Sequence, residues 1–187
     1  MKAKTRFSSD KRTWHPSPLA GQIVLVTTLD ADGGSNVAPK SWISMMAFHP
    51  ALLALGCRLE HRTARNIFRT GEFVVNVPGD DLARAVWQCP RLPHPRPVEA
   101  LGLTPRPAQA VGPPLVEECR AHLECVLDRD LTFGNEVVIF GNIVAGSIDQ
   151  DALETPDPYA YLRPPLFLED GTYGVIERAR RPGASDR

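Results

Sequence analysis

Apolar residues occur along this chain in short runs that have the length and the β-branched content of strands. The run 22–29 (QIVLVTTL) is apolar on both faces, which predicts a central strand buried on both sides. Residues 30–34 (DADGG) predict a hairpin turn, so 35–45 is expected to return as an antiparallel strand. Further strands are expected over 51–58, 72–77, 121–128 and 136–148.

Two segments between these strands change to a helical period. Residues 63–70 predict a short helix, with Thr63 as its N-cap and Gly71 as its stop. Ile67 and Phe68 would form the apolar side of this helix. Residues 81–88 predict a second helix, because an acidic pair stands at its positive end.

The count of elements predicts the fold class. At least six strands and two short helices favour an antiparallel β-barrel, closed or nearly closed, with the helices outside. Gly141 and Gly146 in the last long strand are expected at bends or bulges. The length of 187 residues suits a single domain spanning 1–187.

Proline is unevenly distributed along this domain. Of 18 prolines, many fall in residues 89–115, which we interpret as a long irregular excursion that acts as a lid, a partner-gripping arm or a meander. Residues 1–13 and 181–187 are expected to be flexible ends.

Charge and hydropathy exclude several classes of function. The formal net charge is -1, with 21 Lys and Arg against 22 Asp and Glu, so no basic excess indicates binding to nucleic acid or to an anionic membrane. The N-terminus is polar, without the apolar core of a signal peptide. The longest apolar stretch, 43–55, is broken by His49 and Pro50, so no membrane span is expected and the protein is predicted to be cytoplasmic.

The cysteines do not indicate a metal site. Cys57, Cys89, Cys119 and Cys125 form no C-x-x-C pair, and no histidines stand at zinc-ligand spacing. We interpret them as reduced thiols of a cytosolic protein and expect no metal.

Polar residues gather in two places that a barrel would bring together. The segment 36–45 (NVAPKSWISM) carries Lys40, Ser41, Trp42 and Ser44, and a helix start follows at 61–66 (HRTARN). A helix N-terminus suits a phosphate, and a tryptophan suits the wall of a flat ring, so the pattern is consistent with a phosphorylated aromatic cofactor. Taken singly, each residue is more often a local hydrogen-bonding group, a surface charge or a core aromatic. The residues alone leave both interpretations open.

Longer motifs add a resemblance to a known family. The segments VLVTTLDADGGSNVAPKSW and LGCRLEHRTARNIFRTGEFVVNVP, with an N-x-x-P-x-S strand, a T-A-R-N-I helix and an E-F-V-V-N-V strand in that order, resemble the flavin reductase-like, FMN-binding split-barrel family, which includes flavoredoxin-type proteins. The likeness runs from about Trp14 to Trp87 and resumes weakly at FGNEVVIFGNIV and LEDGTYGVI.

The resemblance implies a homodimeric split β-barrel that binds FMN noncovalently near the subunit interface. It implies that NADH, NADPH or a redox partner supplies electrons, and that a second flavin or another small molecule accepts them. No catalytic side chain is identified. The cofactor-binding residues implied by position are Lys40, Ser41, Trp42, Ile43, Ser44, Cys57, Arg58, Thr63 and Asn66.

One position departs from the family. Its NADH-using flavin reductases carry G-D-H before the last long strand, where the histidine positions the nicotinamide, and this chain has Gly134, Asn135 and Glu136. A carboxylate there would repel a dinucleotide phosphate, although Glu136 is about equally well explained as a surface residue at a strand entry.

Several hypotheses for the function remain at this point. The first is an FMN-dependent, flavin reductase-like oxidoreductase. The second is an FMN-binding electron carrier or flavin-holding protein without NAD(P)H activity, which Glu136 favours. A split barrel of the pyridoxamine-phosphate-oxidase type is disfavoured by T-A-R-N-I, and a purely structural interaction module would leave the polar residues idle. Cys57 is interpreted mainly as a small core residue.

Overall fold

The computed structural model describes residues 3–4, 6, 8–14, 16–169 and 172–177. The strands are β1 (Gly21–Gln22), β2 (Val24–Leu29), β3 (Ser35–Lys40), β4 (Ile43–Ala47), β5 (Leu52–Arg58), β6 (Glu72–Val77), β7 (Pro105–Arg106), β8 (Leu115–Val116), β9 (Ala121–Phe133), β10 (Glu136–Ile148), β11 (Pro165–Glu169) and β12 (Thr172–Val175). The helices are α1 (Arg62–Thr70), α2 (Ala83–Gln88), α3 (Gln150–Glu154) and α4 (Pro158–Leu162), and short 3-10 helices cover Lys11–Thr13, Asp80–Leu82, Cys89–Arg91 and Val98–Leu101. The prediction of a mainly β chain with short helices is confirmed. The predicted flexible end 181–187 and part of 1–13 lie outside the described residues.

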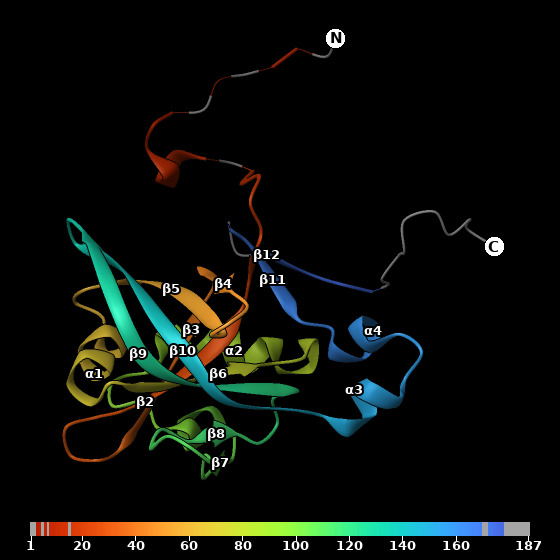
Figure 1. Cartoon of the computed structure of the whole chain (residues 1–187). Helices are drawn as coiled ribbons and strands as arrows, with labels where there is room; N and C mark the ends of the chain where they lie inside the picture. The colour runs from red at the N-terminus through yellow and green to blue at the C-terminus, as the bar shows by residue number, and fades with distance from the viewer. Residues whose placement is uncertain (1–2, 5, 7, 15, 170–171, 178–187) are drawn as a thin grey trace.

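Seven antiparallel strands form the main sheet, in the order β3-β2-β6-β9-β10-β5-β4. Its two edge strands, β3 and β4, are consecutive in the chain, and Ser41 and Trp42 alone separate them. Because three residue steps span at most about 10 Å, the sheet must curl until its edges approach each other. Figure 1 shows this curled sheet with α1 packed at one side. The sheet remains open between β3 and β4 in the described part of the chain.

This topology corrects the prediction of one strand over 35–45. The strand β3 pairs with β2, and β4 pairs with β5 at the opposite edge, so the chain must break its pairing between them. Ile43 lies opposite Leu55, and the backbone N–H of Gly56 donates to the carbonyl of Trp42 over 2.7 Å. The crossing from one edge to the other explains why alternation fails at Ser41 and Trp42.

The first helix is confirmed, with two corrections. Gly71 ends α1 in the left-handed conformation, with φ 73°, and its N–H donates to the carbonyl of Ile67. The N-cap is His61 rather than Thr63, which lies inside the helix and is buried. Ile67 is buried as expected, but Phe68 is exposed, because α1 covers the sheet with a narrow stripe. The second helix also starts later, at α2, after a 3-10 turn at Asp80–Leu82.

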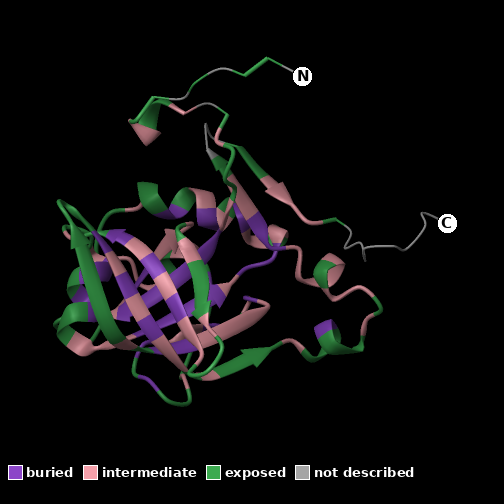
Figure 2. Ribbon diagram, turned by 45° about the horizontal axis from the view of Figure 1, so that its top comes forward, coloured by how far each residue is buried: buried purple, intermediate pink, exposed green. Residues whose placement is uncertain are grey.

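Two clusters of buried side chains lie on opposite faces of β2. Val24 and Val26 join the core inside the curled sheet, whereas Ile23 and Leu25 join a second core outside it. The prediction that 22–29 is buried on both sides is therefore confirmed. Figure 2 shows the buried positions running along the strands of the sheet.

The Pro-rich segment 89–115 supplies much of the second core. Cys89, Val98 and Leu103 are buried there, against α2 and β3. The backbone N–H of Val37 in β3 donates to the carbonyl of Arg96 over 2.8 Å, so the segment also covers this edge of the sheet. Buried positions recur along the segment at Cys89, Val98, Leu103, Val111 and Pro113, and the role of the segment stays a prediction.

The last two strands of the main sheet form a long hairpin. The strand β9 extends beyond the predicted 121–128, and β10 matches 136–148. Irregular pairing occurs beside Gly141 as predicted, but the second irregularity lies between Ile143 and Ala145 rather than at Gly146. The strands β1, β11 and β12 form a separate small sheet. Among the described residues, no helix has both the length and the apolar character that a membrane crossing requires.

Candidate functional site

A cleft of about 850 Å³ lies where β3 passes into β4, and we call it the large cleft. The strand β3 contributes its end, β5 contributes the positions facing it, and α1 begins at its rim. Its lining residues are Asp10, Lys11, Arg12, Pro39, Lys40, Ser41, Trp42, Gly56, Cys57, Arg58, His61, Glu136 and Phe167. Five of the predicted cofactor-binding residues therefore share one wall: Lys40, Ser41, Trp42, Cys57 and Arg58.

The wall of the large cleft at Trp42 depends on a glycine. A Cβ atom placed on Gly56 would lie 2.9 Å from the Cβ of Trp42 and 3.1 Å from its ring atom Cε3. Only a residue without a side chain lets the indole lie this close to β5. Trp42 remains 54% exposed, so its ring presents a flat apolar surface.

A second hollow, of about 450 Å³, lies beside the first and is called the basic pocket. Its lining residues are Asn36, Ala38, Pro39, Lys40, Glu60, His61, Arg62, Thr63, Pro90, His94 and Arg96. Three permanent cations face one carboxylate in this set, which favours an anion. Pro39, Lys40 and His61 line both hollows, so the two are adjacent.

Asn36 gives the clearest sign that the basic pocket takes a polar group. Its side chain is 1% exposed, and neither its Nδ2 nor its Oδ1 has a hydrogen-bond partner in the described protein. An unsatisfied buried amide of this kind carries a free-energy penalty of about 1–3 kcal/mol. Asn36 lines the basic pocket, so a polar ligand that reached this amide would give its two atoms the partners that they lack.

The side chain of Arg62, which lines the basic pocket, is positioned by the carboxylate of Asp30. Asp30 Oδ1 accepts from Arg62 Nε over 2.7 Å and from Asn66 Nδ2 over 2.8 Å. The Asn66 amide also donates to Thr28 Oγ1 over 3.0 Å. Asn66 thus faces the interior and orients Arg62 through Asp30, rather than lining either hollow.

Lys40, Cys57 and His61 meet where the two hollows join. Lys40 Nζ lies 3.4 Å from Cys57 Sγ and 3.1 Å from His61 Nδ1, and Sγ lies 3.6 Å from the same nitrogen. Burial, followed by the charges of Lys40 and Arg58, lowers the pKa of His61 below its usual 6.5. The imidazole is therefore neutral near pH 7, and its Nδ1 lies within reach of both the Lys40 ammonium group and the Cys57 thiol.

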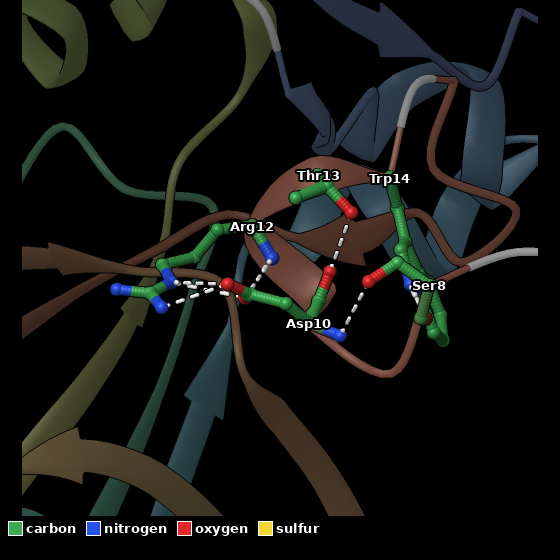
Figure 3. Close-up of polar contacts among 5 residues, drawn as sticks. All are labelled: Ser8, Asp10, Arg12, Thr13 and Trp14. Carbon is green, nitrogen blue, oxygen red and sulfur yellow. Dashed lines mark hydrogen bonds and ion pairs between the residues drawn. The ribbon is translucent and has the colours of Figure 1, made fainter.

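Glu136 and the N-terminal turn both line the large cleft. Glu136 opens β10 opposite Arg58, and its charge acts on Arg12. Figure 3 shows how the turn is held: Asp10 accepts from the backbone N–H and the guanidinium of Arg12, and Trp14 Nε1 donates to the carbonyl of Ser8. Hydrogen bonds from Arg12 also lower the pKa of Asp10. This turn adds a mixed-charge rim that sequence reasoning did not foresee.

The predicted site residues are not all equally placed. Thr63 lines the basic pocket, while Ile43 packs toward the core and Ser44 is exposed on β4, outside both hollows. Their assignment to a cofactor stays a prediction. Sequence reasoning missed Asn36, His94 and Arg96 as lining residues. The Asn of N-x-x-P-x-S was a visible signal for Asn36, but the Pro-rich segment gave none for the other two.

Comparison with models of protein families identifies the family of this chain. The model described as Flavin reductase like domain matches residues 17–176. The chain belongs to the flavin reductase-like family. The resemblance seen in the motifs is thereby confirmed.

Relatives resemble this chain over most of its length. The uncharacterized protein YwrF of Bacillus subtilis (strain 168) is 30% identical over 191 residues, covering 94% of this chain and 91% of that protein. A flavin reductase (NADH) of Kitasatospora aureofaciens is 28% identical over 144 residues, covering 75% and 71%.

Solved structures share the fold at lower identity. Flavoredoxin of Desulfovibrio vulgaris (Miyazaki F) superposes with a TM-score of 0.81 at 21% identity, over 96% of this chain and 99% of that one. A protein with a split barrel domain from Shewanella frigidimarina NCIMB 400 gives a TM-score of 0.83 at 20% identity, over 97% and 100%. These likenesses establish the split-barrel fold.

Proposed function

We propose that this protein binds FMN in the joined hollows and works as a flavin reductase-like oxidoreductase. It takes a hydride or electrons from NADH, NADPH or a redox partner and passes them to a second flavin or another small acceptor. The observation that carries the proposal is that a basic pocket lies directly beside a larger, partly apolar cleft, with Pro39, Lys40 and His61 lining both. FMN combines a phosphate tail with a flat ring, and this pair of hollows matches that combination.

The phosphate end of FMN is assigned to the basic pocket. Arg62 and Arg96 supply positive charge, Thr63 supplies a hydroxyl, and the free Asn36 amide supplies a donor and an acceptor. The N-terminus of α1 adds backbone N–H groups at the same wall.

The ring end is assigned to the large cleft, where Trp42 forms one wall. When bound, FMN supplies the hydride and electron chemistry of its ring, which no side chain of this protein provides. Trp42 shields that region from water, and Lys40 places one cation at the junction of the two hollows. Glu136 lies on the same cleft and sets the charge that an incoming electron donor meets.

Absorption spectroscopy tests the proposal. Purified protein is stripped of small molecules, titrated with FMN, and then mixed under anaerobic conditions with NADH or NADPH. We expect one FMN to bind per chain and to bleach with at least one of the two nucleotides. The flavin reductase (NADH) among the relatives supports NADH as the first donor to try.

Each outcome of this experiment has a definite meaning. Failure to bind FMN would refute the assignment of the two hollows. FMN that binds but bleaches only with dithionite or a redox protein would exclude NAD(P)H and leave the electron-carrier alternative. Variant Arg96→Gln should weaken FMN binding, whereas Arg106→Gln, which removes an exposed arginine far from both hollows, should not.

A further inference from the structure

Cys57 differs from the other three cysteines in its surroundings. All four thiols are free and buried. Burial raises the pKa of Cys89, Cys119 and Cys125, the last to about 12, so these three remain protonated and unreactive. Cys57 alone among them lines the large cleft, with 6% of its surface exposed.

Two side chains beside Cys57 suit a reactive thiol. Lys40 Nζ donates to Sγ over 3.4 Å, so a positive charge lies beside the sulfur where negative charge develops as it attacks. His61 Nδ1 lies 3.6 Å from Sγ and can take the thiol proton. In the described residues, the hydrogen bonds of Lys40 go to Cys57 and His61 and to no carboxylate.

We propose that Cys57 is a reactive thiol, assisted by Lys40 and His61, that undergoes exchange with small anionic disulfides entering the large cleft. The expected reagent is an anion because Lys40 and Arg58 line the large cleft together with Cys57. The cleft, at about 850 Å³, is large enough for a molecule of moderate size. Lys40, Cys57 and His61 contact one another at the boundary between the large cleft and the basic pocket.

The exchange needs no further reactant. The thiol proton of Cys57 passes to His61 Nδ1, and Sγ attacks one sulfur of the disulfide. A new S–S bond to Cys57 forms, the S–S bond of the reagent breaks, and its other half leaves as a thiolate. Cys57 is oxidised to a mixed disulfide, and one half of the reagent is reduced.

The probe is 5,5′-dithiobis(2-nitrobenzoate), an anionic aromatic disulfide that releases one coloured thiolate for each cysteine modified. Native, flavin-free protein is mixed with an excess, and the release is followed in time. We expect one fast equivalent per chain, with three more after denaturation. Peptide mass mapping should place the fast adduct on Cys57. No fast equivalent, or an adduct on another cysteine, would overturn the proposal.

Variants show whether Lys40 and His61 assist the reaction of Cys57 or whether its thiol is simply accessible to the reagent. Lys40→Met and His61→Asn should each slow the fast phase about tenfold or more, because they remove the cation and the base. Lys40→Arg keeps the charge and should restore most of the rate. Cys57→Ser should abolish the fast phase, whereas Cys119→Ser, in the other core, should keep it. Equal rates in Lys40→Met, His61→Asn and the parent would show that Lys40 and His61 play no part.

Protection by FMN links this thiol to the cofactor site, and that step rests on the proposed function. Saturating FMN should slow the labelling of Cys57, because the ring end of the site covers the sulfur. If FMN does not bind but the fast thiol is present, the proposed function fails and the reactive thiol stands. If FMN binds and no fast thiol is found, the reactive thiol fails alone.

Discussion

At the scale of single residues, Asn36 allows function and stability to be separated. Its buried amide lacks partners, so Asn36→Leu removes an unsatisfied group and should raise the free energy of unfolding of the flavin-free protein by about 1 kcal/mol. The same change should weaken FMN binding about tenfold or more, because the ligand loses a donor and an acceptor. Thermal denaturation and a flavin titration measure the two effects.

Asn76 is the matched control for that prediction. It is equally buried, but its side chain donates to Leu25 and Thr27 and accepts from the N–H of Val116. Asn76→Leu should therefore destabilise the protein by about 3 kcal/mol or more, since three partners lose their bonds. If both variants lower the free energy of unfolding by the same amount, the Asn36 amide is not an unsatisfied group in the flavin-free protein, and the prediction fails.

Glu136 carries a second prediction at this scale. Because its carboxylate lines the large cleft, Glu136→His should raise kcat/KM for NADH, by removing a negative charge from the path of a dinucleotide phosphate. We expect kcat/KM to rise about tenfold, which corresponds to about 1.4 kcal/mol of added transition-state stabilisation. Glu99→His, at an exposed position of the 3-10 helix Val98–Leu101, should leave kcat/KM unchanged. An unchanged value for both variants would mean that Glu136 has no role in nucleotide use.

Residue-level reasoning from sequence found the lining of the two hollows in part. Lys40, Trp42, Cys57 and Thr63 stand in recognisable motifs, and the structure places all four on the joined hollows. The inward turn of Asn66 could not be foreseen, because its acceptor Asp30 belongs to a distant hairpin turn. Sequence spacing gives the face of a helix but not the group that lies opposite.

At the scale of elements, the close contact between Gly141 of β10 and Phe73 of β6 gives a stability prediction. A Cβ atom on Gly141 would lie 2.5 Å from Cζ of Phe73, which is fully buried. Gly141→Ala should therefore lower the free energy of unfolding by about 1–3 kcal/mol, through overpacking of the core. On β12, a Cβ at Gly174 meets only an ordinary contact of 3.5 Å, so Gly174→Ala should have little effect. Urea denaturation compares them, and equal midpoints would show that Phe73 has room to move.

Elements with a strong local pattern were predicted well, and those set by topology were not. The run 22–29 and the Gly71 helix stop follow from local chemistry, so both are confirmed. The break at Ser41 and Trp42 depends on which strand lies at each sheet edge, and alternation does not carry that information. The packed Pro-rich segment was equally hidden, because its buried residues are scattered among prolines without a period.

At the scale of the whole molecule, two histidines make stability depend on pH. Burial, then Lys40, lowers the pKa of His61, and burial, then Arg96, lowers that of His94. The unfolded chain binds more protons than the folded one below about pH 6.5, so this stability is complete above 6.5 and is lost as pH falls through the lowered values. Melting temperatures between pH 7.5 and 5 should fall less steeply for a double variant with asparagine at both positions.

The comparison needs a control, because carboxylates also titrate in acid. His49→Asn changes an exposed histidine on a turn and should leave the pH dependence of the melting temperature as it is in the parent. An unaltered slope in the double variant would contradict the prediction. Phosphate must be absent from the buffer, since an anion in the basic pocket would favour the protonated histidines and mask the effect.

The homodimer implied by the family resemblance is the remaining prediction at this scale. The edge strand β4 and the turn after it expose Met45, Met46 and a fully exposed Phe48 within four residues. A contiguous apolar edge of this kind is unfavourable in water unless another surface covers it. A second copy of the chain would cover it beside the large cleft, because Trp42 immediately precedes β4.

Light scattering should therefore give twice the chain mass, and the Met45→Glu, Phe48→Glu double variant should give a single chain. Leu153→Glu, at another exposed apolar position on α3, should remain a dimer, and a parent of single-chain mass would contradict the prediction.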